Sequence, residues 1–286
     1  MGMKMRKFNK TQVFFLIGAV LFTALFLFSG VMAMRQYKDT KQSAEAFNAV
    51  ADLVKPAPTP VLTSVEDATG EDETDTPASY EPAPELTAYD KYAAVYEQNS
   101  DFIGWISIED TKINYPVMQT PGNRDFYLKH AFDKSYSEYG VPYMQENCKL
   151  GLSDNCVIYG HHMQDGSMFA DLCKFESEDF YKEHKTIHFD TLAGYGEYEI
   201  VCVFKTAAYA ADGFKYYHFV DAADAAEFNS FLSTCQSLAL YDTGVSAEYG
   251  DKLITLSTCE YSRSNGRMVI VAKLVQPAAN EVGGNG

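Results

Sequence analysis

A charge-free apolar run near the amino end is the feature that most constrains this chain. Residues 13–34 are mainly apolar and include no charged side chain. As a helix, this run would span about 33 Å, enough to cross the ~30 Å hydrocarbon core of a bilayer. In lipid, a helix is the form in which a single segment satisfies its own backbone polar groups. The sequence therefore predicts one transmembrane helix at residues 13–34.

A cleaved signal peptide is the alternative for this run. Ala24 and Ser29-Gly30 are small residues of the kind found near cleavage sites, but the apolar region of a signal peptide is normally only about 7–15 residues long. The length therefore favours an uncleaved signal-anchor. Because the tail 1–12 is basic, we expect it to stay in the cytoplasm and everything after Arg35 to lie outside, as in a single-pass protein of the cell membrane.

Residues 35–85 are predicted to form an extracellular stalk and an acidic, Pro-rich linker. The first part, 36–54, is polar with scattered apolar residues and is consistent with a helix that continues out of the membrane. Residues 56–84 hold six of the ten prolines and no Lys or Arg, so they cannot bury enough apolar surface to offset their ordering entropy. We interpret them as a solvated spacer, with an acidic interaction tail as the alternative. The net charge of −16 argues against a nucleic acid partner.

Residues 86–277 have the length of one ordinary domain. Many short strands and few helices predict a mostly β fold, a closed and mainly antiparallel β-barrel with peripheral helices. Pro116 should place part of its strand at an edge or a bend. Residues 278–286 are expected to form a flexible tail. The predicted strands are 102–108, 112–118, 151–159, 186–190, 197–207, 253–258 and 267–274, and the predicted helices are 86–99, 167–175, 177–184 and 221–237.

A predicted β-hairpin near the carboxyl end brings a thiol and a guanidinium together. Residues 253–258 and 267–274 are rich in apolar and β-branched residues, and Asn265-Gly266 favours a chain reversal between them. Cys259 follows the first strand and Arg267 begins the second, so antiparallel pairing places them side by side at one rim. A cation beside a thiol favours the thiolate and can hold a developing oxyanion.

A second motif supports a catalytic role for this cysteine, although a cysteine at a strand end is more often a small buried hydrophobe. Residues 155–163 read Asn-Cys-Val-Ile-Tyr-Gly-His-His-Met, a strand that ends at Gly160 and presents histidine at once. Cysteine chemistry needs a group that protonates the leaving amine, and histidine is the usual one. A histidine of this motif and Cys259 are therefore the predicted catalytic pair.

Three motifs in this order carry a resemblance to a known family. Thr-Leu-Ser-Thr-Cys at residues 255–259 is followed by Arg267, and Tyr-Gly-His lies upstream at 159–161. Together they resemble the sortases, the transpeptidases of Gram-positive surfaces. The finer pattern resembles class B, with Ile-Asn-Tyr-Pro-Val-Met at 113–118 and Asp-Gly-Ser-Met-Phe at 165–169.

The resemblance covers roughly residues 89–275 and implies the sortase β-barrel and a two-step acyl transfer. Cys259 would attack the carbonyl after threonine in a sorting motif of a secreted substrate protein, of the type Asn-Pro-x-Thr followed by Asn or Gly. His161 would protonate the departing amine, and an amine of peptidoglycan or of a pilin would take the acyl group. Arg267 would hold the oxyanion or the substrate backbone with its planar guanidinium. The family pattern also implies five substrate-binding residues: Asn114, Met118, Tyr159, Ser257 and Glu260.

Several neighbouring residues compete for these roles. Arg263, in the hairpin loop, is the alternative to Arg267, which we favour because it begins the second strand. His162 should point to the opposite face from His161 and have a packing or surface role. Tyr261 stands where some members of the family carry an acid. The other histidines lack a motif: His130, His184, His188 and His218.

The six cysteines form no evident disulfide or metal framework. Their even number is typical of exported disulfide proteins, but this domain is large enough for its own core and Cys259 has to stay free. We expect no obligatory disulfide, and Cys148 with Cys156 is the pairing that proximity suggests. There is no close Cys-x-x-Cys, and adjacent histidines on a strand face opposite ways, so we expect no zinc or other cofactor.

Three other functions are compatible with parts of this pattern. In a secreted cysteine endopeptidase, water takes the thioester, and in a silent membrane-tethered binding module Cys259 does not react. The order of His before Cys argues against a papain-like protease, and a caspase-like Gln-Ala-Cys-x-Gly is missing. A class C-like pilin polymerase is the near alternative within the family. Such enzymes commonly have a second membrane segment, whereas residues 277–286 are polar and Gly-rich.

Overall fold

The structure, a computed structural model, describes residues 9–56, 86–211 and 213–275. The predicted flexible tail and nearly all of the predicted acidic linker therefore lie outside the described residues. The chain divides into two compact units, Met1–Ala46 and Phe47–Gly286.

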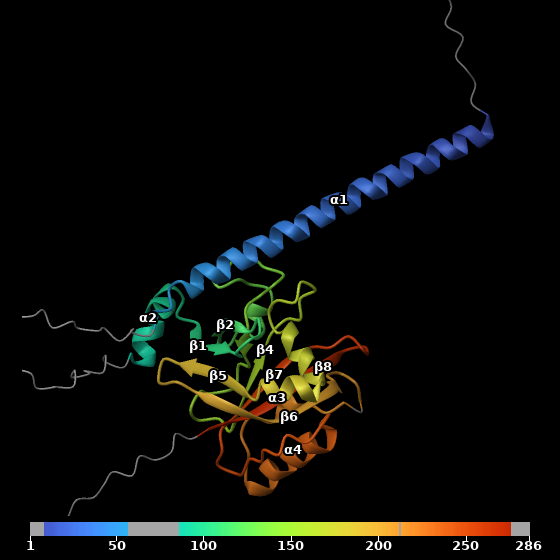
Figure 1. Cartoon of the computed structure of the whole chain (residues 1–286). Coiled ribbons are helices and arrows are strands. Elements are labelled where there is room, and N and C mark those ends of the chain that lie inside the picture. Colours follow the sequence, from blue (N-terminus) through green and yellow to red (C-terminus); the bar gives the residue numbers. More distant parts are fainter. Residues whose placement is uncertain (1–8, 57–85, 212, 276–286) are drawn as a thin grey trace, which may run out of the picture. The chain divides into compact units, whose positions relative to one another are not determined.

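Helix α1 (Lys10–Ala51) makes up the described part of the first unit and continues into the second (Figure 1). Large apolar side chains along it are exposed, among them Phe14, Leu21 and Phe26. Such a continuous apolar surface is stable in lipid rather than in water. By length and composition, α1 is the one helix in the described part of the chain that is able to cross a membrane, as a signal or an anchor helix.

In the described part of the second unit, eight strands close into a barrel in the order β1-β2-β3-β4-β7-β8-β6-β5. The predicted closed β-barrel is thus confirmed. Neighbouring strands are antiparallel except in the β2–β3 and β4–β7 pairs, which are parallel. The strands are β1 (Phe102–Ser107), β2 (Asn114–Met118), β3 (Tyr143–Met144), β4 (Asn155–Tyr159), β5 (Thr186–Thr191), β6 (Glu197–Ala207), β7 (Leu253–Cys259) and β8 (Gly266–Leu274).

Helices surround the barrel, and the α-helices of the second unit begin at capping side chains. Thr87, Ser177 and Asp224 each accept a hydrogen bond from a backbone N–H of the first turn, which satisfies one of the donors that a helix start leaves unpaired. The helices are α2 (Ala88–Gln98), α3 (Glu178–Glu183) and α4 (Ala225–Leu238), with 3₁₀ turns η1 (Phe126–Leu128), η2 (Ala170–Glu176) and η3 (Tyr216–His218).

Two predicted elements begin later than the sequence pattern suggested. The strand predicted from Gly151 begins at Asn155, because Gly151 has a φ of 73° and the N–H of Ser153 closes a turn on Lys149. The helix predicted from Asp221 begins at Ala225. Asp221 accepts a hydrogen bond from the N–H of Asp154 instead, which ties this segment to the start of β4.

Two further details differ from or qualify the predicted elements. The helix predicted at 167–175 is the 3₁₀ helix η2 and begins only at Ala170, since Met168 has a positive φ of 58°. The two-residue strand β3 was not predicted, because it is too short to show a period. Strand β3 pairs with β2 only at Met118, so at Pro116 β2 has β1 as its one neighbouring strand. This agrees with the edge position expected for the proline.

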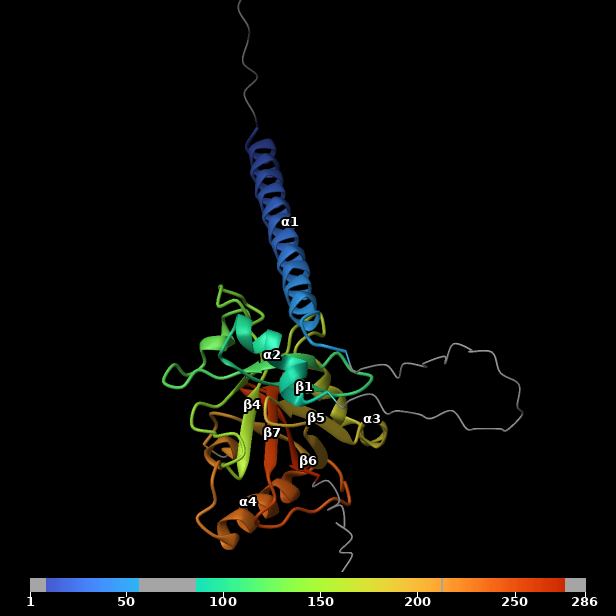
Figure 2. The same cartoon turned by 90° about the vertical axis from the view of Figure 1, so that its left-hand side faces the viewer.

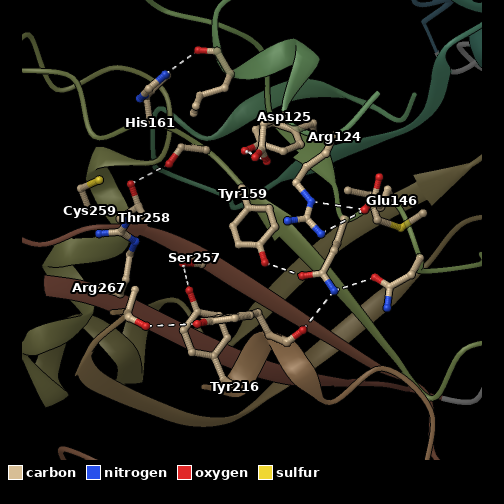
Figure 3. Close-up of a pocket in the computed structure, with 18 of the residues that line it drawn as sticks. Arg124, Asp125, Glu146, Tyr159, His161, Tyr216, Ser257, Thr258, Cys259 and Arg267 are labelled. Atoms are coloured by element: carbon tan, nitrogen blue, oxygen red, sulfur yellow. Dashed lines mark hydrogen bonds and ion pairs between the residues drawn. The ribbon is translucent and has the colours of Figure 1, made fainter. Parts of the chain in front are cut away.

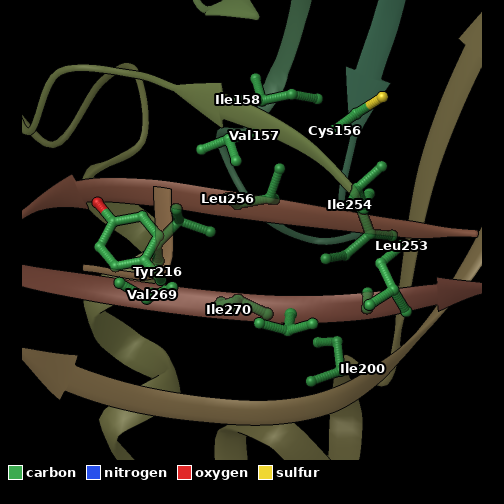
Figure 4. Packing of buried hydrophobic residues seen from close by; sticks show 14 of the residues in the cluster. Cys156, Val157, Ile158, Ile200, Tyr216, Leu253, Ile254, Leu256, Val269 and Ile270 are labelled. Carbon is green, nitrogen blue, oxygen red and sulfur yellow. The ribbon is translucent and has the colours of Figure 1, made fainter. Parts of the chain in front are cut away.

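The barrel interior forms the main hydrophobic core (Figure 4). Ile254 and Leu256 of β7 pack there with Ile270 of β8 and Ile200 of β6, and all four are buried. Strands β7 and β8 are buried along most of their length, which explains why they are rich in apolar and β-branched residues. This core fixes the register of the strands that carry the site.

A second cluster lies where α2 packs beside β1. Val50, from the last turns of α1, is buried there with Tyr92, Val95 and Trp105. The N–H of Lys55 also bonds to the carbonyl of Lys91 at 3.1 Å. The segment that follows Ala46 is therefore part of the catalytic unit's own core.

Candidate active site

The parallel pairing of β4 with β7 sets the geometry of the site. Tyr159 lies beside Ser257, and because both strands run in one direction, the residues that follow them emerge at the same rim (Figure 2). The N–H of Gly160 donates to the carbonyl of Ser257 at 3.1 Å, and the hydroxyl of Thr258 donates to the carbonyl of Gly160 at 2.8 Å. These bonds bring His161 and Cys259 to one rim of the barrel.

Gly160 permits this close approach. A Cβ atom at this position would overlap the buried ring of Phe169. The glycine before the histidine is therefore required by packing, and the chain turns directly from β4 to His161.

The β7–β8 hairpin brings Arg267 to the same rim. Cys259 and Arg267 are direct partners in the antiparallel ladder, as predicted. The loop between the strands is closed by a hydrogen bond of 3.0 Å from the N–H of Glu260 to the carbonyl of Gly266, and Asn265 has a positive φ of 55°. The Asn-Gly signal thus marks the position where the chain turns into β8.

His161, Cys259 and Arg267 line one cavity of about 740 Å³ (Figure 3). This volume is in the range of small-molecule and peptide pockets. One end of the cavity holds these three residues, and the other is polar, with an ion pair of 3.1 Å between Arg124 and Glu146. Other lining residues include Leu128, Tyr143, Gln145, Tyr159, Tyr209, Tyr216, Tyr217, His218 and Ser257.

His161 is half-buried, and its Nε2 lies 2.7 Å from the carbonyl oxygen of Leu128. Burial lowers the pKa of His161 below its ordinary value, and the hydrogen bond to Leu128 offsets this only in part. The ordinary pKa of histidine is about 6.5, so the imidazole is mainly neutral at pH 7. A neutral imidazole is able to accept a proton from a thiol.

Arg267 is held by its own strand and by an aromatic ring. Its Nη1 donates to the carbonyl of Gly266 at 2.9 Å, and its guanidinium lies 5.9 Å from the ring centre of Tyr209. Arg263, the alternative from the sequence, is exposed and lies outside the lining of the cavity. The geometry therefore favours Arg267 as the cation of this site.

The model of the sortase domain matches residues 106–275 of the chain. This chain belongs to the sortase family. The sortase B of Listeria monocytogenes is 34% identical over 189 residues, which cover 65% of this chain and 74% of the relative. The sortase B of Staphylococcus aureus is 33% identical over 189 residues, which cover 65% and 75%.

Solved structures agree with this assignment. The crystal structure of sortase B from B. anthracis in complex with AAEK1 matches with a TM-score of 0.65 at 27% identity and covers 84% of this chain and 100% of that one. A Staphylococcus aureus sortase B–substrate complex matches with a TM-score of 0.60 at 30% identity and covers 65% and 85%. This sortase is therefore a sortase B-like cysteine transpeptidase.

The five expected substrate-binding residues of this sortase occupy different environments. Tyr159 and Ser257 line the cavity. Met118 is fully buried, and Asn114 accepts a hydrogen bond of 2.6 Å from the indole of Trp105; neither belongs to the lining. The geometry favours direct substrate contact for Tyr159 and Ser257 and a structural role for the other two.

Glu260, the fifth of these residues, also lies outside the lining and braces the hairpin loop. Its carboxylate accepts hydrogen bonds from the N–H of Ser262 at 2.8 Å and from the hydroxyl of Ser262 at 2.6 Å, and Lys205 lies 3.7 Å away. Desolvation opposes the charge, but these donors outweigh it and hold the pKa of Glu260 below its ordinary value. Glu260 therefore fixes the loop between Cys259 and Arg267.

His162 contacts the backbone of Cys259 and lies outside the cavity lining. Its Nδ1 lies 2.9 Å from the carbonyl oxygen of Cys259 and 3.4 Å from the sulfur of Cys173. Tyr261 packs on the His162 ring, with ring centres 5.0 Å apart. The expected packing role of His162 agrees with these contacts, but the sequence did not predict its bond to the carbonyl of Cys259.

Other contacts at the site gave no signal in the sequence. The hydroxyls of Tyr216 and Ser257 lie 2.5 Å apart, and the hydroxyl of Tyr159 donates to the side chain of Gln145 at 2.5 Å. Tyr216 comes from η3, which follows β6, and Gln145 directly follows β3, so only the folded barrel brings them to β4 and β7. No local motif marks them.

Arg267→Lys is expected to lower turnover of a sorting-motif peptide by about 10²–10³-fold, the usual cost of an oxyanion donor. Lysine keeps the charge but loses the planar pair of donors. The measurement is kcat for peptide cleavage, with thermal unfolding to verify the fold. Arg263→Lys is the matched control and should retain the wild-type rate. If Arg263→Lys lost turnover and Arg267→Lys kept it, Arg263 would be the oxyanion donor instead.

Proposed function

We propose that this sortase cleaves a sorting motif of the type Asn-Pro-x-Thr followed by Asn or Gly, after threonine, and joins the acyl group to an amine of peptidoglycan or of a pilin. The observation that carries the proposal is the shared cavity, in which a thiol, an imidazole and a guanidinium meet. Two related structures support the substrate classes: one Staphylococcus aureus sortase B is bound to substrate, and another sortase B is complexed with triglycine.

The first step forms a thioester. His161 takes the proton of the Cys259 thiol, and the sulfur bonds to the threonine carbonyl carbon, while Arg267 stabilises the developing oxyanion. The carbon–nitrogen bond to the next residue then breaks, and the leaving amine takes the proton from His161. The amino-terminal part of the substrate stays on Cys259.

The second step reverses these movements with a different amine. The acceptor nitrogen attacks the thioester carbonyl carbon and passes its proton to His161. The carbon–sulfur bond breaks, and His161 returns the proton to the Cys259 sulfur. This sequence of two acyl transfers is a ping-pong scheme.

The proposed location is the cell membrane, with residues 13–34 of α1 as the anchor. The exposed apolar side chains of this helix and its length support an anchor. The basic tail 1–12 supports a cytoplasmic amino end and an extracellular catalytic unit. Secreted proteins with a carboxyl-terminal sorting motif would meet the cavity on that side.

A peptide assay tests the proposal with the full-length chain in detergent. We expect cleavage of an Asn-Pro-x-Thr-Asn or Asn-Pro-x-Thr-Gly peptide after threonine. Without an amine, turnover should be slow and the acyl adduct should accumulate on Cys259. Adding triglycine or hydroxylamine should raise the rate and divert the product to the conjugate, as measured by mass spectrometry of the peptide and of the intact chain.

Two outcomes would favour the alternatives. If only the free acid forms at a rate indifferent to amine, the chain is a cysteine endopeptidase. If a lysine-bearing pilin peptide is the acceptor and glycine peptides are inert, the class C-like polymerase activity is the better description.

A further inference from the structure

The imidazole of His161 is held by a segment that is remote in the sequence. This segment is the β2–β3 connection (residues 119–142), which contributes the carbonyl of Leu128 at 2.7 Å from Nε2. A carbonyl oxygen only accepts hydrogen bonds, so Nε2 must carry the hydrogen. In the neutral ring, Nδ1 is then the nitrogen with the free lone pair.

We propose that Leu128 is a positioning residue whose carbonyl fixes His161 as the Nε2–H tautomer, so that Nδ1 exchanges the proton with Cys259 and the leaving amine. The inference deepens the proposed function, because it rests on His161 as the acid–base group. Figure 3 draws the bond of Nε2 as a dashed line, and the other ring nitrogen of His161 lies on the side of the ring nearer Cys259. After Nδ1 accepts a proton, the same carbonyl also stabilises the imidazolium, as an orienting third group does in other nucleophile–base pairs.

The Leu128 carbonyl is fixed because η1 is clamped on both sides. The hydroxyl of Tyr127, a buried residue, accepts from the Asn99 amide at 2.8 Å and donates to the Asp101 carboxylate at 2.8 Å. On the other side, the His130 ring stacks on Phe126 with centres 3.9 Å apart and an angle of 5°. The carbonyl between these two anchors has little freedom to turn away from His161.

Gly140 closes the connection against this carbonyl. Its φ is +59°, and a Cβ atom there would overlap the carbonyl oxygen of Tyr127 and lie 2.8 Å from that of Leu128. Alanine at this position would therefore push the Leu128 carbonyl away from His161. Gly122, in the same connection, also has a positive φ of +80°, but a Cβ atom there meets nothing within 4 Å.

This pair of glycines gives a matched test. Gly140→Ala and Gly122→Ala both introduce a side chain at a left-handed residue, so both carry the backbone strain. Only Gly140→Ala displaces the carbonyl that holds His161. We expect kcat for peptide cleavage to fall about tenfold or more in Gly140→Ala, with little change in KM, and to stay near wild type in Gly122→Ala.

A spectroscopic measurement reports the tautomer directly. The full-length chain in detergent micelles is labelled with ¹⁵N-histidine, and His161→Gln assigns the signals. At pH 8 we expect wild-type His161 to show a protonated Nε2 and an unprotonated Nδ1, and Gly140→Ala to show a mixture of tautomers. If Gly140→Ala does not fold, Tyr127→Phe, which removes one hydroxyl from the clamp, replaces it and should shift the same signals.

A wild-type spectrum with the hydrogen on Nδ1 would overturn the inference, as would a folded Gly140→Ala with wild-type kcat and tautomer. These failures differ from a failure of the proposed function. If the proposed function is wrong, His161→Ala remains active, whatever tautomer the imidazole of wild-type His161 adopts.

Discussion

Cys259→Ala will abolish both acyl-transfer steps and lower peptide turnover by a factor on the order of 10⁶, the cost of removing a nucleophile from a comparable catalytic set. Alanine has no atom that can bond to the acyl group, so neither thioester nor conjugate forms. Turnover is measured from the cleavage products. Mass spectrometry of the intact chain should show an adduct on the wild type and none on the variant.

Cys173 is the matched control because it is the other cysteine that is not fully buried. Burial raises its pKa to about 11, so it carries little thiolate at neutral pH. We expect Cys173→Ala to keep near-wild-type turnover, and a thiol reagent to modify Cys259 in preference to Cys173. An active Cys259→Ala, or inactivation by modification of Cys173 alone, would contradict the assignment of the nucleophile.

His161→Ala is the second large effect that we expect, with kcat reduced by about 10²–10⁴-fold, the usual contribution of a positioned acid–base group. The leaving amine would then depart without a proton, and the thiol would lose the base that lines the cavity with it. The measurement is single-turnover acylation and overall turnover with the same peptide.

His162→Ala is the control for His161. Its Nδ1 contacts the backbone carbonyl of Cys259, so the main loss is one partly buried hydrogen bond, about 1 kcal/mol of folding free energy. Urea unfolding should detect that loss, while turnover changes only mildly. A dead His162→Ala with an active His161→Ala would invert the two roles.

The hairpin is the part of the site that local sequence predicted best. Two strands rich in apolar and β-branched residues, joined at Asn265-Gly266, specify an antiparallel pair, and that pairing alone sets Cys259 beside Arg267. The barrel and the pairing of His161 with Cys259 needed the family resemblance as well. A parallel pair such as β4–β7 joins segments about 100 residues apart, and no local pattern encodes which strands become neighbours.

Backbone groups and burial explain what the sequence did not reveal. A backbone carbonyl is chemically the same in every residue type. No sequence motif therefore marks the carbonyl of Leu128 as the partner of His161. Met118 lies in a motif that resembles the family's, yet its side chain is fully buried, and a motif does not say which of its members point inward. The late start of α4 depends on Asp154, a distant partner of Asp221.

The burial of Val50 bears on how this enzyme is prepared for crystallography. A soluble fragment that begins at the predicted domain boundary, residue 86, would lose Val50 and the bond between Lys55 and Lys91, and would leave the cluster of Tyr92 and Trp105 without that cover. Exposed aromatic surface of this kind promotes association between copies. A fragment that keeps this cluster covered has to include the segment from Phe47 onward, so the last turns of α1 are as much a part of the folded enzyme as its barrel.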